Sequence, residues 1–253
     1  MSQTKIAIVT GGSRGLGKSM CLHIAQNGHD VILTYNSKRA EADAVVAEIV
    51  KLGRRTLALQ LDVSKSATFD DFVETIKAAL KANWGRSDFD ILVNNAGIGI
   101  HADFAQTSEQ QFDTLADIHL KGPFFLTQKL LPVMKDGGRI VNLSSGLARF
   151  SLPGYSAYAA MKGAIEVLTR YQAKELGARG ISVNVIAPGA IETDFGGGTV
   201  RDNKQINTFI ASQTALGRVG LPDDIGGAVA MLLSDEGRWI NGQRIEVSGG
   251  MFL

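Results

Sequence analysis

The stretch Ile6-Ala-Ile-Val-Thr-Gly-Gly-Ser-Arg-Gly-Leu-Gly17 decides the fold of this chain. Its first four residues are apolar, which predicts a buried strand. A glycine-rich turn follows, and residues 15–28 then have helical spacing. A strand, a glycine-rich turn and a helix in this order favour a bound phosphate, because backbone N–H groups and the helix dipole attract an anion. The stretch therefore predicts a nucleotide site, and the alternative is a tight loop without a ligand.

Short apolar runs of the same kind recur along the chain and alternate with longer segments of helical spacing. This alternation predicts an α/β protein with a doubly wound, mostly or wholly parallel sheet of about seven strands flanked by helices. The expected strands include 6–9, 31–33, 91–93, 140–143 and 183–186, and the expected helices are 15–28, 39–53, 66–83, 108–135, 155–178 and 222–234. We expect a single domain over residues 1–253. The polar, glycine-containing stretch 189–215 predicts a mobile substrate flap.

Charge and cysteine content exclude several kinds of partner. The 253 residues carry 26 Lys and Arg against 25 Asp and Glu, so neither nucleic acid nor an anionic membrane surface is an expected partner. The single cysteine, Cys21, lies in a helical pattern without other metal-ligating residues, which predicts a packing role, no metal site and a reducing cytoplasm. No apolar run reaches the roughly 20 residues that span a membrane. We expect a cytoplasmic protein that binds small molecules.

The sequence Tyr158-Ala-Ala-Met-Lys162, with Ser145 upstream, contains the candidate chemistry. Residues four apart on a helix share one face, so the ammonium group can stabilise the phenolate. A free phenol has a pKa of about 10, and a nearby cation lowers it toward the range where general acids work at neutral pH. The same spacing also occurs in surface helices with a half-buried Tyr and a solvated Lys. Its weight therefore depends on the neighbouring motifs.

These motifs together resemble the short-chain dehydrogenase/reductase family. The glycines are spaced Gly11-x-x-x-Gly15-x-Gly17, Asn94-Asn-Ala-Gly97 follows a later strand, and Pro188-Gly189 with Thr193 follows another. The resemblance runs from about residue 5 to Met251 and implies a single Rossmann domain that binds a dinucleotide. The cofactor contacts that it implies are Gly11, Ser13, Arg14, Gly15, Leu16, Gly17, Asn36, Ser37, Asp62, Val63, Asn94, Ala96, Gly97, Tyr158, Lys162, Pro188, Gly189, Ile191 and Thr193. The alternatives are structural: the Asn-Asn-Ala-Gly turn also stabilises the sheet, and Thr193 can cap a flap helix.

The end of the second expected strand indicates which dinucleotide binds. NAD-dependent members of the family place an acidic residue there, whereas this chain continues from Tyr35 into Asn36-Ser-Lys-Arg39 without a carboxylate. Arg14, Asn36, Ser37 and Lys38 offer donors for a 2′-phosphate. We therefore predict NADP(H) as the cofactor. The alternative is that Arg14 and Lys38 are ordinary solvated cations.

The resemblance also implies roles for the catalytic residues. Tyr158 donates a proton to the substrate carbonyl oxygen, Ser145 hydrogen-bonds that oxygen, and Lys162 holds the nicotinamide ribose and lowers the tyrosine pKa. Ser144 is the alternative serine, although its spacing to Tyr158 fits less well. His119 stands where the family usually has Asn. We expect it either to keep a proton relay to the lysine or to pack as a structural residue.

The predicted function is NADPH-dependent, reversible reduction of a ketone to a secondary alcohol. Ile191-Glu-Thr-Asp194 and the ending Gly249-Gly-Met251 resemble 3-oxoacyl-carrier-protein reductases, which indicates a 3-oxoacyl thioester as one substrate. Docking of an acyl carrier protein is left open, because Arg179 suits an acidic partner and Asp136 does not. A sugar, polyol or steroid alcohol dehydrogenase and a non-catalytic NADP(H)-binding sensor are the alternatives.

The pocket and the assembly are expected from the same resemblance. Family members are commonly homotetramers paired through the helices that flank the catalytic residues, which are 108–135 and 155–178 in this chain. The candidate residues of the substrate pocket are apolar and lie near strand ends, where core packing is the alternative: Ile98, Ile100, Leu147, Phe150, Leu152 and Phe195.

Overall fold

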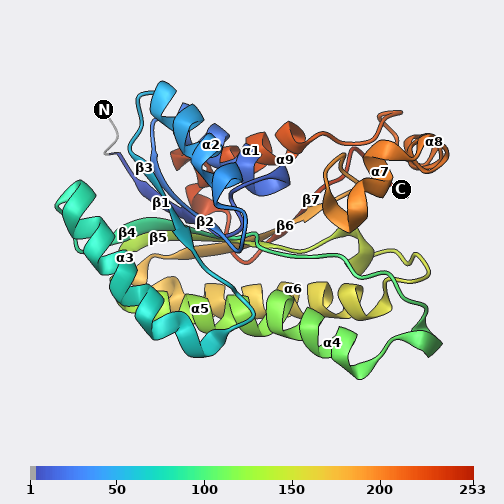
Figure 1. Cartoon of the computed structure of the whole chain (residues 1–253), viewed down its shortest axis with the longest axis horizontal. Coiled ribbons are helices and arrows are strands. Elements are labelled where there is room, and N and C mark those ends of the chain that lie inside the picture. Colours follow the sequence, from blue (N-terminus) through green and yellow to red (C-terminus); the bar gives the residue numbers. More distant parts are fainter. Residues whose placement is uncertain (1–3) are drawn as a thin grey trace.

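A seven-stranded sheet runs through the centre of the computed structural model, which describes residues 4 to 253 (Figure 1). Every strand pair is parallel, and the strand order is β3-β2-β1-β4-β5-β6-β7. The predicted α/β fold with a parallel sheet is confirmed. Residues 1–3 of the predicted domain lie outside the described residues. In chain order the strands are β1 (Ile6–Val9), β2 (Asp30–Tyr35), β3 (Thr56–Gln60), β4 (Phe89–Asn94), β5 (Met134–Leu143), β6 (Ser182–Pro188) and β7 (Arg244–Val247).

Helices cover both faces of the sheet, with α1, α2 and α9 on one face and α3, α4, α5 and α6 on the other (Figure 1). The short helices α7 and α8 belong to the segment between β6 and α9. No helix within residues 4–253 is both long and apolar enough to cross a membrane. The bounds are α1 (Gly15–Gln26), α2 (Arg39–Lys51), α3 (Phe69–Trp84), α4 (Glu109–Ala116), α5 (Gly122–Leu130), α6 (Ser156–Leu176), α7 (Thr199–Asp202), α8 (Lys204–Ser212) and α9 (Pro222–Leu233).

The pleat of the strands builds two cores, one on each face of the sheet. In β1, Ala7 and Val9 pack with α1, α2 and α9, whereas Ile6 and Ile8 pack with α3 and α5. All four side chains are almost fully buried. Burial of an aliphatic side chain contributes about 1.5–3 kcal/mol, so a strand that is apolar on both faces is held firmly between the helical layers. This explains why β1 carries no polar alternation in its sequence.

The strand order reverses between β1 and β4, which places two turns at one end of the sheet. The chain leaves β1 through Thr10–Gly17 and leaves β4 through Asn95–Gly97. Doubly wound sheets bind ligands beyond the carboxyl ends of their strands at such a reversal. The glycine-rich turn and the Asn-Asn-Ala-Gly turn therefore lie together where a dinucleotide is expected.

The prediction of one helix over 108–135 is wrong. The segment contains α4, a π-helical turn at Asp117–Lys121 and α5, and β5 already begins at Met134. A side chain at Gly122 would place its Cβ 2.5 Å from the carbonyl oxygen of Val63, so the helix must pass this loop closely. A π turn adds one residue to a helical turn, and such turns are frequent at functional sites. It reorients His119, which lies within it.

Candidate active site

The glycine-rich turn lies directly before α1, and its glycines form a tight cradle that has no side chains. Gly11 and Gly15 have φ angles of 64° and 53°, which glycine adopts without strain. A Cβ at Gly17 would lie 2.1 Å from the carbonyl oxygen of Gly11, so this position also requires glycine. The turn is fixed to β2, since the Gly11 N–H donates to the Thr34 hydroxyl at 3.2 Å and the Gly12 N–H donates to the Thr34 carbonyl at 2.8 Å.

Thr10 and Asn95, which were not predicted as site residues, join this turn to the turn after β4. The Thr10 hydroxyl accepts hydrogen bonds from the N–H groups of Asn95 and Ala96 at 2.9 and 3.0 Å. The Asn95 amide donates to the Thr10 carbonyl at 2.8 Å. Asn94 points into the sheet, where its amide donates to Asn142 at 2.8 Å. The Asn94 side chain is therefore structural here, whereas Gly97 at the end of the turn is exposed.

Ser145 and Tyr158 meet where β5 ends and α6 begins. Tyr158 is 7% exposed, and its phenol is hydrogen-bonded to the Ser145 side chain. The Ser145 hydroxyl also accepts the N–H of Leu147 at 3.2 Å, which fixes its orientation. Burial raises the pKa of Tyr158, and the Ser145 hydrogen bond lowers it by less. The phenol is therefore protonated at neutral pH, as a proton donor to a carbonyl oxygen must be.

Lys162 lies one turn along the same face of α6. Its amine is 5.6 Å from the centre of the Tyr158 ring and donates to the carbonyl oxygen of Leu143 at 2.7 Å. Burial lowers the pKa of Lys162 to about 7. This differs from the prediction that the lysine lowers the tyrosine pKa. Removal from water disfavours the charged form of each group, and it is the largest cause of both pKa shifts.

The two candidate serines have different environments. The Ser144 hydroxyl donates to the Glu166 carboxylate at 2.7 Å and also contacts the carbonyl oxygen of Lys162 at 3.1 Å. Both of its contacts are with residues of α6, and none is with the Tyr158 phenol. Ser145 is the serine that the fold brings to Tyr158, as its spacing in the sequence predicts.

Comparison with known proteins identifies the family. A family model described as enoyl-(acyl carrier protein) reductase matches residues 11–252. A solved short-chain dehydrogenase/reductase from Serratia marcescens is 30% identical, has a TM-score of 0.91, and each chain covers 99% of the other. This chain belongs to the short-chain dehydrogenase/reductase family.

Two further members of the family are similar over nearly the whole chain. The 3-oxoacyl-[acyl-carrier-protein] reductase FabG of Staphylococcus aureus is 38% identical over 255 residues, which are 100% of both chains. The angucycline C-6 ketoreductase LanV, solved with bound NADP, is 34% identical with a TM-score of 0.93 over 98% of this chain and 95% of its own. These findings confirm the predicted family and oxidoreductase class, and the bound NADP supports the predicted cofactor.

The residues of this short-chain dehydrogenase/reductase fit such a cofactor. The three glycines leave a cradle at the N-terminus of α1, where N–H groups can meet a pyrophosphate. Asn36 and Ser37 are exposed beyond β2, and Tyr35 is buried without a carboxylate beside it. The Arg14 side chain is 54% exposed and lies 3.8 Å from Asp194, whereas Lys38 pairs with Glu41 at 3.0 Å. Both cations are exposed, and the longer ion pair of Arg14 leaves it less tightly held by its carboxylate than Lys38.

Among the other predicted cofactor residues, Thr193 is shown in contact with this cradle. Thr193 lies against Gly15, since a Cβ there would be 3.6 Å from the Thr193 side chain. The Asp62 carboxylate accepts the hydroxyl of Ser64 at 2.6 Å, which fixes it after β3. Val63 follows Asp62, Pro188 ends β6, and Gly189 passes close to Ser248. Ser13 and Leu16 lie in the glycine-rich segment itself, and Ile191 is a buried residue near the start of the flap.

His119 packs against the ring of Tyr158. The two ring centres are 5.1 Å apart at an interplanar angle of 87°, an edge-to-face contact. Nε2 lies 2.8 Å from the Ile98 carbonyl oxygen and 3.3 Å from the Ile98 backbone nitrogen, so it can donate to the first or accept from the second, depending on the tautomer. Nδ1 is buried and has no hydrogen-bond partner among residues 4–253. Burial and the nearby Lys162 hold the pKa of His119 well below its usual range, so the imidazole is neutral near pH 7.

We expect His119→Asn to keep kcat within about tenfold of the wild-type value. A neutral imidazole does not exchange protons over the assay range, so the kcat profile between pH 6 and 9 should also keep its shape. The measurement is steady-state reduction across this range. A loss of more than about a hundredfold in kcat, roughly 2.7 kcal/mol of barrier, would contradict the expectation and give the imidazole a catalytic role.

The flap after β6 covers Tyr158. The Phe195 ring centre lies 5.7 Å from that of Tyr158. Gly99 leaves room for this ring, because a Cβ there would lie 2.8 Å from the Phe195 ring. Gly196, Gly197 and Gly198 follow with φ angles of 60°, 77° and 79°, a conformation that favours glycine. Phe195 thus shields the phenol from water, and the three glycines behind it can act as a hinge.

Proposed function

We propose that the protein transfers hydride from NADPH to a ketone and releases a secondary alcohol. The observation that carries this proposal is the buried Tyr158 phenol, hydrogen-bonded to Ser145 with the Lys162 amine beside its ring. When bound, the nicotinamide supplies the hydride. Ser145 orients the carbonyl oxygen, Tyr158 gives it a proton, and Lys162 binds the ribose hydroxyls and supports the phenolate left behind. Phe195 excludes water from these groups.

For the substrate we favour a free ketone with an apolar or aromatic body. Phe195 lies beside Tyr158 with the two rings tilted at 57°, and the rings of His101 and Tyr155, just before α6, meet edge to face 5.1 Å apart. LanV, an angucycline ketoreductase, is a relative of this kind. A 3-oxoacyl thioester is the second candidate, because FabG matches the full chain. Carrier-protein docking has less support, since Arg179 is held by Asp136 at 2.7 Å.

The proposed function is tested by following NADPH absorbance with a panel of ketones. The panel contains β-tetralone, a 3-ketosteroid, acetoacetyl-coenzyme A and a ketose, which represent the aromatic, steroid, thioester and sugar classes. We expect turnover to be fastest with β-tetralone. Fastest turnover with the thioester would favour the second candidate. Tight NADPH binding without turnover of any ketone would favour a sensor and would contradict reductase activity.

For the cofactor, we expect Arg14→Ala to weaken NADPH selectively. A charge-assisted hydrogen bond contributes about 1.5–3 kcal/mol, so the KM for NADPH should rise by about 10- to 100-fold while that for NADH changes little. Initial rates with each cofactor measure this. Lys77→Ala removes an exposed cation of α3 and serves as the control for net charge. Equal kcat/KM for the two cofactors in the wild-type protein would refute a 2′-phosphate site.

We also propose that the protein is a homotetramer. Large apolar side chains are exposed on the outer surface of α4, α5 and α6, which lie next to one another in Figure 1: Phe112, Phe124, Phe125, Val167 and Tyr171. Exposed apolar surface of this extent is typical of interfaces. Light scattering should give about four times the chain mass of 27.0 kDa. A monomeric mass at micromolar concentration would contradict this proposal. The cytoplasmic location stays a prediction.

A further inference from the structure

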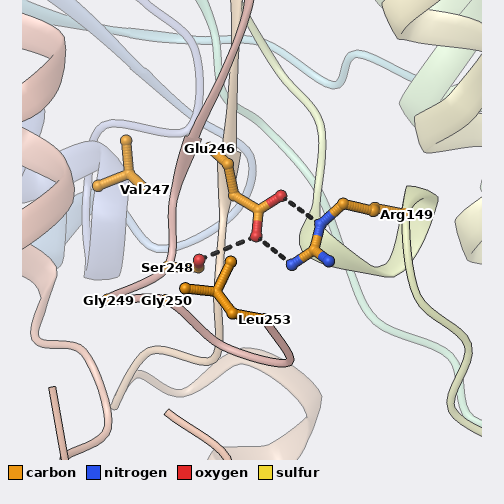
Figure 2. Close-up of a pocket in the computed structure, with 7 residues that line it drawn as sticks. All are labelled: Arg149, Glu246, Val247, Ser248, Gly249, Gly250 and Leu253. Carbon is orange, nitrogen blue, oxygen red and sulfur yellow. Dashed lines mark hydrogen bonds and ion pairs between the residues drawn. The ribbon is translucent and has the colours of Figure 1, made fainter. Parts of the chain in front are cut away.

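Arg149 holds the C-terminal tail of the chain at the edge of an open surface pocket (Figure 2). Its Nε and Nη2 atoms donate to the two carboxylate oxygens of Glu246, each at 2.7 Å. Nη2 also donates to the Met251 carbonyl at 2.7 Å, and Nη1 donates to the Phe252 carbonyl at 3.1 Å. One side chain therefore binds a carboxylate in a bidentate manner and two backbone carbonyls as well. The planar guanidinium group suits such a set of acceptors, and a lysine ammonium does not.

The backbone of Arg149 ends the short loop that begins at Ser145. A single 3-10 turn, Gly146–Ala148, separates the two residues, and the Arg149 N–H donates to the Gly146 carbonyl at 2.8 Å. Within this turn the Leu147 N–H donates to the Ser145 hydroxyl. Phe150 folds back on Gly146, where a Cβ would lie 2.8 Å from the Phe150 ring. Arg149 thus lies at the end of the same short turn that begins at Ser145.

At the other end, the tail is bound to the flap segment. The Phe252 N–H donates to the Gln213 carbonyl at 2.9 Å, and the N–H of Leu216 donates to the Gly249 carbonyl at 3.0 Å. Met251, Phe252 and Phe150 pack with Ile206 and Ile210 of α8 in one apolar cluster. Phe252 has a φ angle of 52°, the only positive value outside glycine in the described part of the chain. A side chain keeps this conformation only where its surroundings hold it.

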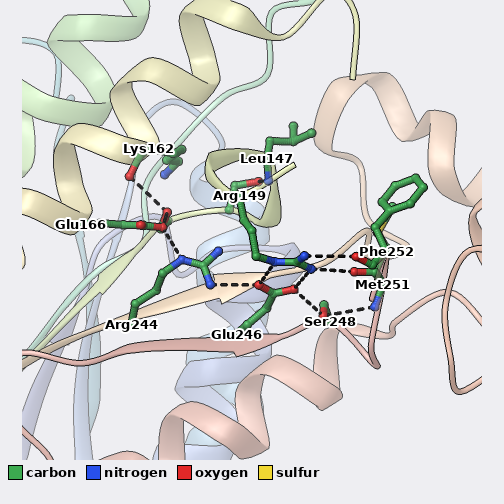
Figure 3. Close-up of polar contacts among 11 residues, drawn as sticks. Leu147, Arg149, Lys162, Glu166, Arg244, Glu246, Ser248, Met251 and Phe252 are labelled. Atoms are coloured by element: carbon green, nitrogen blue, oxygen red, sulfur yellow. Dashed lines mark hydrogen bonds and ion pairs between the residues drawn. The ribbon is translucent and has the colours of Figure 1, made fainter. Parts of the chain in front are cut away.

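A chain of ion pairs continues from Glu246 to the catalytic helix (Figure 3). Arg244 donates to Glu246 at 2.9 Å and to Glu166 of α6 at 2.7 Å. Glu166 in turn accepts the Ser144 hydroxyl, which also contacts the Lys162 carbonyl. The Arg149 guanidinium, with a smaller contribution from Arg244, lowers the pKa of Glu246 to about 2, so the carboxylate stays charged at neutral pH. The loop, the tail and α6 are thereby joined in one polar network.

We propose that Arg149 is a positioning residue for carbonyl reduction. It holds the loop of residues 145–150, which contains Ser145, in a fixed position relative to helix α8 of the flap. The inference rests on the proposed reductase function, because a substrate carbonyl must lie between Ser145 and the flap. Arg149 does not contact the reacting atoms. Its effect comes from the alignment of Ser145, and a misplacement of about 1 Å in a catalytic group can cost about a hundredfold in rate.

The chain offers a matched control for this proposal. Arg179 makes the same kind of contacts, with one carboxylate, Asp136, and two backbone carbonyls, those of Leu131 and Met134. Its side chain is 35% exposed, against 38% for Arg149, and it lies in the 3-10 turn Gly177–Arg179 beyond the C-terminal end of α6, whose first turns carry Tyr158 and Lys162. Arg149→Ala removes four hydrogen bonds and Arg179→Ala removes three, so the two substitutions remove similar contacts. Only the first removal disturbs the Ser145 loop.

The experiment compares the kinetics of the two variants with the best ketone of the panel. We expect Arg149→Ala to lower kcat/KM for the ketone by about 10- to 100-fold and to leave the Kd for NADPH within about twofold. Arg179→Ala should stay close to the wild-type protein. Millimolar guanidinium should restore part of the activity of Arg149→Ala, and Arg149→Lys should restore less. Kinetics of Arg149→Ala that match those of Arg179→Ala would overturn the proposal.

Amide hydrogen exchange tests the proposal by a measurement that does not require the protein to turn over a ketone. We expect Arg149→Ala to speed amide exchange in both residues 145–150 and residues 204–216, while Arg179→Ala leaves both segments unchanged. Faster exchange in the tail alone would overturn the proposal. If the wild-type protein reduces no ketone yet exchange changes in both segments, the proposed substrate reaction fails and the coupling of the two segments stands.

Discussion

Tyr158→Phe should lower kcat for ketone reduction by about 10³-fold, roughly 4 kcal/mol of barrier. The substitution removes the proton donor and leaves the buried ring, so the fold and the His119 contact are retained. The phenol is protonated at neutral pH because burial raises its pKa. Water cannot replace it as the proton donor, because the site is shielded from solvent. NADPH oxidation under saturating ketone measures the effect.

Tyr155→Phe is the matched control for this prediction. Tyr155 lies three residues earlier, and its ring contact with His101 does not need the hydroxyl. We expect kcat of this variant to stay within about twofold of the wild-type value, with NADPH affinity and melting temperature of both variants little changed. Undiminished turnover by Tyr158→Phe would exclude the tyrosine as the proton donor.

Lys162→Met should abolish most activity and yet raise the stability of the protein at pH 7. Burial lowers the pKa of Lys162 from 10.5 to about 7, so holding the charged amine costs the folded state up to roughly 5 kcal/mol. The variant also loses the hydrogen bond to the Leu143 carbonyl, which costs about 1–3 kcal/mol. We expect a net gain of about 2 kcal/mol, or roughly 4–8 °C in Tm.

The gain should shrink as the pH rises. The unfolded chain keeps the lysine proton up to about pH 10.5, whereas the folded protein releases it near pH 7. Between these values the unfolded state binds more protons, so wild-type stability rises with pH relative to that of Lys162→Met. Thermal melts at pH 7 and pH 9.5 measure the difference. Lys18→Met, on exposed α1 surface, is the control and should show no gain. A lower Tm of Lys162→Met at pH 7, or a gap independent of pH, would contradict this account.

Local patterns predicted the fold and much of the candidate site. Apolar runs mark β1, β2, β4, β5 and β6, and the glycine spacing marks the turn before α1, because these patterns report burial and backbone conformation. The π turn at His119 was missed, since apolar spacing does not distinguish a single π turn from the α-helix on either side of it. Thr10 and Asn95 were missed because their hydrogen bonds join segments that are 85 residues apart.

The sequence by itself determined the parallel sheet, the cofactor cradle and the identity of the Ser145, Tyr158 and Lys162 group. Each depends on residue type at short spacing, which the chain carries locally. Only the tertiary structure decided the charge states of this group, because burial by the surrounding helices raises the pKa of Tyr158 and lowers that of Lys162. It also joined Arg149 to the tail and Phe195 to Tyr158, since both contacts exist only when distant segments pack against each other.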